Sequence, residues 1–154
     1  MPKQSAGLLM YRHAAEQLEV FLVHPGGPFW AKKDLGAWTI PKGEFAEEED
    51  ALAAAQREFH EETGFTAQGT FIELGTIRQA GGKTVFAWAF EGDCDPEALV
   101  SNVCTIEWPP RSGRTMEIPE ADRGAWFALS EARERLHKNQ LEFLDRLAAR
   151  SLLR

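Results

Sequence analysis

The chain has 154 residues, of which 44% are hydrophobic and 27% are charged, and its formal net charge is −7. We therefore predict one domain over residues 1–154 and no broad binding to extended nucleic acid or anionic membranes, because both partners require a basic surface. No apolar run approaches the ~18 residues that span a bilayer, and the N-terminus lacks a signal-peptide pattern, so we expect a cytoplasmic protein.

Short apolar runs rich in β-forming residues predict several strands. They cover residues 7–11, 18–24, 37–40, 71–79, 83–92 and 103–108. Pro25 to Gly36 is predicted to be a loop, and Gly81 and Gly82 predict a hairpin between two of the strands. Residues 109–124 are predicted to form a long loop. Because strands and helices alternate irregularly, a doubly wound parallel sheet does not fit.

Helical patterns occupy three parts of the chain. The predicted helices cover residues 47–63, a segment that starts at Glu131 behind an N-cap at Ser130, and about 140–153. In the first of them, Leu52, Ala55 and Phe59 form one apolar stripe that faces the core. Gly64 follows as a residue that can adopt a left-handed conformation and end the helix.

The first predicted helix carries three carboxylates on one face. At 100° per residue, Glu58 and Glu62 lie ~40° apart, and Glu61 lies ~60° to the other side of Glu58. Like charges at this spacing repel, and Arg57 is the one compensating charge nearby. Hard divalent cations with oxygen ligands would offset this repulsion more completely. An ordinary solvated face is the alternative, and it suits the run 47–50 better than this cluster.

The residues around this helix match a longer pattern. The fixed positions are Gly43, Glu49, Arg57, Glu58, Phe59, Glu61, Glu62, Gly64 and Phe65. Gly43 follows Pro41, so we expect it to let the backbone turn sharply and to bring its carbonyl toward the same metal. In its spacing the segment closely resembles the Nudix box of the Nudix (MutT-like) hydrolases.

This resemblance implies a fold and a reaction. The implied fold is an α/β/α sandwich with a mixed β-sheet, and the implied reaction is Mg²⁺- or Mn²⁺-dependent hydrolysis of a nucleoside diphosphate linked to another group. The resemblance makes Glu58, Glu61 and Glu62 metal ligands, assisted by the Gly43 carbonyl, and makes Glu49 and Arg57 residues that brace the loop and the helix. One of the three glutamates would also help to activate water.

The substrate is less clear from the sequence. The segment "WTIPKG" before the box resembles the bacterial branch related to diadenosine tetraphosphate hydrolases. Lys42 is then a candidate phosphate contact, with a solvated lysine as the alternative. Arg111 and Arg114, together with Lys32 and Lys33, are candidates for neutralising a long phosphate chain.

Further candidates have a structural reading beside the functional one. Glu120 is favoured over Glu117 as an extra catalytic or metal-binding carboxylate, against an exposed loop residue. Candidates for stacking on a base, each of which equally suits core packing, are Trp30, Phe86, Trp88 and Trp108. His24 and His60 are predicted to be structural or exposed.

Three functions remain open at this point. The first is hydrolysis of a dinucleoside polyphosphate, and the second is a housecleaning or RNA 5′-end pyrophosphohydrolase. The third is a non-catalytic module that senses a nucleotide, which the loss of a box glutamate would favour; none is lost. All three have a small-molecule nucleotide or a capped end as partner, and the oligomeric state is not predicted.

Overall fold

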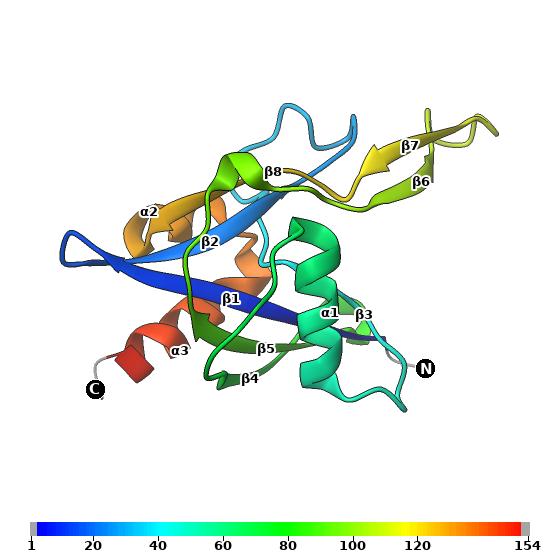
Figure 1. Cartoon of the computed structure of the whole chain (residues 1–154). Helices are drawn as coiled ribbons and strands as arrows, with labels where there is room; N and C mark the ends of the chain where they lie inside the picture. Colours follow the sequence, from blue (N-terminus) through cyan, green and yellow to red (C-terminus); the bar gives the residue numbers. More distant parts are fainter. Residues whose placement is uncertain (1–2, 152–154) are drawn as a thin grey trace.

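The apolar runs near the N-terminus form the centre of a mixed sheet that has helices on both faces (Figure 1). The computed structural model describes residues 3–151. Its strands are β1 (Gln4–Ala14), β2 (Gln17–Pro25), β3 (Lys42–Glu44), β4 (Ile72–Arg78), β5 (Thr84–Glu91), β6 (Val103–Glu107), β7 (Thr115–Pro119) and β8 (Ala121–Ala128). Its helices are α1 (Ala51–Thr63), α2 (Leu129–Arg135) and α3 (Leu141–Ser151), with short 3₁₀ turns η1 (Ala80–Gly82), η2 (Pro96–Ala98) and η3 (Lys138–Gln140).

The main sheet runs in the order β4-β5-β1-β2-β8. β1 is parallel to β5 and antiparallel to β2, which explains why the chain reads as neither a simple meander nor a parallel sheet. The start of β1 also pairs with the short strand β3, so that Ala6 lies opposite Gly43. This pairing holds the segment before α1 against the centre of the sheet. β6 and β7 form a separate two-stranded hairpin that projects from the body of the molecule (Figure 1).

β1 is buried on both faces because successive side chains alternate between two cores. Leu8 and Met10 pack with Phe59 of α1 on one side of the sheet. Leu9 packs with Phe143 of α3 on the other side. The result is the α/β/α sandwich with a mixed sheet that the sequence predicted. No helix within residues 3–151 is long and apolar enough to cross a membrane.

Three predictions about strands were wrong. Residues 37–40 make only isolated bridges, Thr39 with Val23 and Trp38 with Leu136, whereas the strand in this region is β3. The predicted loop 109–124 contains β7 and the start of β8. Most of β7 is exposed on both faces, so its sequence lacks the apolar alternation by which a half-buried strand is predicted.

The helices begin at other residues than predicted. α1 starts at Ala51 rather than at residue 47, because the side chain of Asp50 accepts a hydrogen bond from the Ala53 amide at 3.0 Å. Gly64 ends α1 in the left-handed conformation, at φ 81°, as predicted. α2 starts at Leu129 without a side-chain cap, so Ser130 is not its N-cap.

Candidate metal centre and active site

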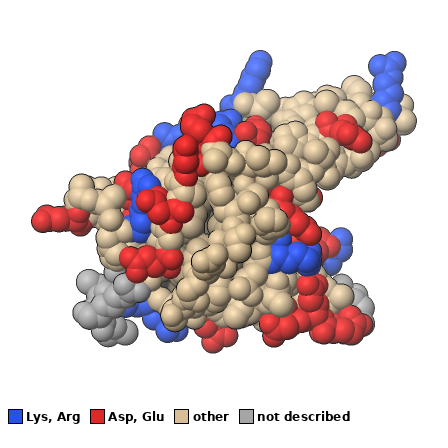
Figure 2. Space-filling view, in the orientation of Figure 1, with Lys and Arg blue, Asp and Glu red and all other residues tan. Residues whose placement is uncertain are grey.

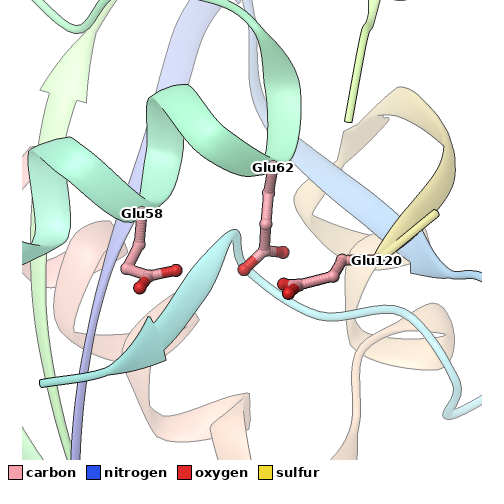
Figure 3. A group of neighbouring side chains, drawn as sticks. All are labelled: Glu58, Glu62 and Glu120. Carbon is pink, nitrogen blue, oxygen red and sulfur yellow. The ribbon is translucent and has the colours of Figure 1, made fainter. Parts of the chain in front are cut away.

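Three carboxylates from distant parts of the chain meet at one end of the sheet. Glu58 and Glu62 project from the same face of α1, and Glu120 lies between β7 and β8 (Figure 3). One oxygen of each lies within 4.8 Å of the others. Glu58 and Glu62 are buried, and Glu120 is half-buried. We call Glu58, Glu62 and Glu120 the carboxylate cluster.

The strand β3 brings the backbone close to the cluster. The Lys42 amide donates a hydrogen bond to Glu62 Oε2 at 3.1 Å. Gly43 lies under Glu58, and a Cβ atom at Gly43 would overlap the Glu58 carboxylate. The predicted sharp turn at Gly43 was wrong, since this residue lies within a strand. The position requires glycine for space: any larger residue would displace a glutamate of the cluster.

Asn102 joins Glu120 to the helix. Its backbone amide donates to the Glu61 carbonyl at 2.7 Å, and its own carbonyl accepts from the Glu120 amide at 3.0 Å. Its side-chain amide donates to Glu120 Oε1 at 3.4 Å. Asn102 was not predicted, because its role depends on a loop between two segments that lie far apart in the sequence.

The electrostatics of the cluster favour a bound cation. Burial, reinforced by the charges of Glu120 and Glu58, raises the pKa of Glu62 to about 8. Burial also raises the pKa of Glu58, against the influence of Arg57. Without a counter-ion the cluster therefore binds protons in place of cations. Converging oxygen ligands and strained negative charge are what Mg²⁺ or Mn²⁺ require, so the residues fit a hard divalent cation.

Arg57 organises the carboxylates around the helix. Its Nε and Nη2 donate to the two oxygens of Glu49, each at 3.1 Å. Its Nη1 donates to Glu58 at 2.8 Å and to Glu61 at 3.5 Å. Glu61 is not brought into the carboxylate cluster: its side chain is 39% exposed and contacts Arg57. These contacts raise the pKa of Arg57, with the hydrogen bond to Glu49 as the main cause.

Lys42 connects the carboxylate cluster to a neighbouring pocket of about 260 Å³. The pocket is lined by Pro25, Trp30, Ala37, Thr39, Lys42, Gln79, His137, Asn139 and Gln140. Burial lowers the pKa of Lys42, and the nearby Lys83 lowers it further. The two lysines thus form a concentrated positive charge that an anion can neutralise. The sequence offered no signal for Lys83 or for the polar residues of η3 as parts of one pocket.

Other predicted site residues lie apart from the cluster. Arg111 and Arg114 are exposed at the turn of the β6–β7 hairpin, whereas Glu120 follows the opposite end of that hairpin. At about 3.4 Å per residue, the five-residue strands place the turn roughly 15 Å from the level of Glu120. Glu117 is exposed in the middle of β7.

The aromatic candidates separate into two groups. Trp30 lines the pocket beside Lys42. Phe86 and Trp88 pack against the core on the α1 side of the sheet, and Trp108 is half-buried in the hairpin. His60 is exposed and His24 is fully buried.

Acidic and basic groups are interspersed on the face of the molecule drawn in Figure 2. That face shows no continuous basic surface of the kind that tracks a nucleic-acid backbone. The concentrated positive charge of the molecule near the carboxylates is instead the local pair Lys42 and Lys83.

A family model for the NUDIX domain matches residues 1–147. Among proteins with curated descriptions, none matches the sequence. The fold is similar to the NUDIX domain of Shewanella oneidensis NrtR, solved in complex with ADP ribose, with a TM-score of 0.69 and 18% identity over 98% of this chain and 89% of that one.

Two further solved structures share the fold. A C. elegans Ap4A hydrolase in a binary complex has a TM-score of 0.66 and 23% identity over 99% of both chains. A structure from work on MutT of Aliivibrio salmonicida and Vibrio cholerae has a TM-score of 0.58 and 15% identity over 96% of both chains. At these identities the likeness shows a common fold.

Proposed function

Because the chain belongs to the NUDIX family of pyrophosphohydrolases, we propose that its substrate is a dinucleoside polyphosphate such as diadenosine tetraphosphate. The observation that carries this proposal is the position of the carboxylate cluster beside a pocket with two lysines. A substrate with several phosphates can span both places, with a phosphate at the cluster and the rest of the chain near Lys42. The "WTIPKG" segment that supplies Lys42 supports the same choice.

The carboxylate cluster would hold the cation that the reaction needs. Glu58, Glu62 and Glu120 supply converging oxygens, and we retain Glu61 and the Gly43 carbonyl as further proposed ligands from the same helix and from β3. When bound, a hard divalent cation such as Mg²⁺ or Mn²⁺ screens phosphate charge and makes a coordinated water more acidic.

The chain's own residues orient the reacting groups. Arg57 fixes one oxygen of Glu58 at 2.8 Å, which restricts how that carboxylate can point. The Lys42 amide fixes one oxygen of Glu62 in the same way, and the Lys42 ammonium is available for a phosphate oxygen. Arg111 and Arg114 remain proposed contacts, and from the hairpin turn they would serve the part of a long substrate that extends away from the cluster.

The test compares substrates with the wild-type protein and with Lys42→Ala. With Mg²⁺ present, we expect diadenosine tetraphosphate to be split asymmetrically into ATP and AMP. We expect Lys42→Ala to lower kcat/KM roughly tenfold more for this substrate than for ATP or dGTP, because the shorter substrates use fewer of the basic contacts. Lys3→Ala is the matched control: Lys3 is 71% exposed and lies outside the pocket lining.

Each other outcome has a defined meaning. A preference for mononucleotides, or an equal loss on all substrates, assigns the protein to housecleaning or RNA 5′-end hydrolysis. Binding of a nucleotide without release of any product assigns it to the sensing modules. Hydrolysis that persists after exhaustive chelation of divalent cations contradicts the role of the carboxylate cluster.

A further inference from the structure

His24 is a buried imidazole that contacts two acceptors. It lies near the end of β2 with none of its surface exposed. Its Nε2 lies 2.6 Å from the backbone carbonyl of Lys33, and its Nδ1 lies 3.0 Å from Asp122 Oδ1. Its ring packs edge-on against Trp38 at 5.3 Å. A carbonyl oxygen has no proton to give, so Nε2 must be the donor in the first contact.

The second contact requires a proton as well. Asp122 is 29% exposed, and the Arg123 guanidinium lies 3.4 Å from the same oxygen, so its surroundings favour the ionised carboxylate. An ionised carboxylate only accepts hydrogen bonds, which makes Nδ1 a donor too. A neutral imidazole has only one N–H and leaves one of the two short contacts without a hydrogen.

The Lys33 carbonyl belongs to the segment that forms one wall of the pocket. Pro25, Trp30, Ala37 and Thr39 are four of the nine residues that line the pocket, and they flank or lie within the loop after β2. The structure fixes this loop near residue 33, where the Lys33 amide donates to the Trp30 carbonyl at 2.9 Å. A shift of Lys33 would therefore move Trp30 and change the shape of the pocket.

We propose that His24 is a positioning residue that holds this wall of the pocket as a doubly protonated imidazolium, bonded to Lys33 and Asp122. The role rests on the proposed function only in that the pocket receives the substrate. Charged groups of the elements packed around the ring are Asp122 and Arg123 of β8, Lys33 and Asp34 of the loop, and Arg135 of α2. Among them, Asp122 contacts the ring directly and balances its charge.

Nitrogen NMR of the full chain, without substrate, tests the protonation state directly. At neutral pH we expect both ring nitrogens of His24 to carry protons. A single protonated nitrogen overturns the proposal. Because His24 is fully buried, replacing it can prevent folding, so the variant used to test its role is Asp122→Asn, which changes a partly exposed side chain and leaves the histidine in place.

For Asp122→Asn we expect one ring proton to be lost at neutral pH and the Lys33 amide to exchange faster with solvent. We expect KM to rise roughly three- to tenfold while kcat stays within about twofold, because the wall of the pocket binds substrate and the carboxylates are untouched. Asp93→Asn is the control, since Asp93 also pairs with an arginine, Arg12, and is 74% exposed.

The measurements separate this proposal from the proposed function. Ring protonation and amide exchange need no turnover, so they support or overturn the role of His24 even if no dinucleoside polyphosphate is cleaved. Unchanged exchange and unchanged KM in Asp122→Asn overturn the role. A fall in kcat without a rise in KM also overturns it, because that result would link Asp122 to the carboxylate cluster instead.

Discussion

The carboxylate of Glu62 is buried beside two others, and this placement couples folding to pH. Its pKa rises from 4.5 to about 8 on folding, so the folded state binds a proton more tightly than the unfolded state does. The resulting stability is fully present below about pH 4.5 and is lost as the pH rises through about 8. A bound cation replaces that proton, and so function and stability place opposite demands on the same residue.

Replacing Glu62 by glutamine should reverse its effect on stability according to the cation. Without divalent cations at pH 8, we expect Glu62→Gln to raise the free energy of unfolding by on the order of 2 kcal/mol, with little effect near pH 4.5. With saturating Mg²⁺ the wild type should be the more stable protein, and the variant should lose turnover by orders of magnitude. Thermal unfolding at several pH values, with and without Mg²⁺, measures the effect on stability.

Glu61→Gln is the matched control for this experiment. It makes the same chemical change one residue earlier on α1, at a half-exposed position outside the carboxylate cluster. Its stability without cations should follow that of the wild type across the same pH range. Equal stabilisation by both variants would mean that the general charge of α1, and not the burial of Glu62, sets the pH dependence.

At the scale of elements, α1 owes its position to both of its ends. Asp50 caps its first turn, and Gly64 ends it, with the Gly64 amide donating to the His60 carbonyl at 2.7 Å. Its middle packs Phe59 into the core, so the opposite side of the helix presents the glutamates to β3 and Glu120. A helix that began at residue 47 would draw the bracing Glu49 out of the loop before α1.

Removing the cap should weaken the helix without removing the site. We expect Asp50→Ala to cost about 1 kcal/mol of stability, because the Ala53 amide loses its acceptor. For a chain of this size that cost lowers Tm by roughly 2–4 °C. Turnover at saturating Mg²⁺ should be unchanged at temperatures well below Tm. Glu48→Ala, at an exposed position before the cap, should leave Tm unaltered; a similar fall in both variants would argue against capping as the cause.

At the scale of the whole molecule, a cation would join parts of the chain that are otherwise held together weakly. Glu120 reaches α1 through Asn102, whose side chain contacts it at 3.4 Å. A cation bound by Glu58, Glu62 and Glu120 would add a direct link between the helix and the junction of β7 and β8. It would also remove the repulsion among the three charges.

Adding Mg²⁺ should therefore stabilise the fold as a whole. At a free concentration 100 times its dissociation constant, a cation that binds only the folded state adds about 2.7 kcal/mol. We expect Tm to rise with Mg²⁺ at neutral pH and protons to be released on binding, since the pKa of Glu62 is raised. Calorimetry in two buffers of different ionisation enthalpy measures this release. Glu120→Gln should reduce both effects, and an unchanged response would remove Glu120 from the proposed ligand set.

The sequence by itself determined the features that depend on neighbours along the chain. The spacing of Glu58 and Glu62 placed them on one face of a helix, and Gly64 ended that helix as predicted. The strand pair at the N-terminus and the hairpin across Gly81 and Gly82 followed from apolar runs and turn residues. Resemblance to the Nudix pattern gave the sandwich fold, because its fixed residues occupy this one continuous segment.

Only the tertiary structure decided which distant groups meet. Glu120 joins the carboxylate cluster, and Glu117 does not, because the β6–β7 hairpin and Asn102 fix the register between them. Gly43 is needed for space beneath Glu58, which becomes visible only when β3 pairs with β1. The pocket beside Lys42 likewise combines the loop after β2 with residues of η3. Such contacts depend on strand order and burial, and periodicity along the chain carries no record of either.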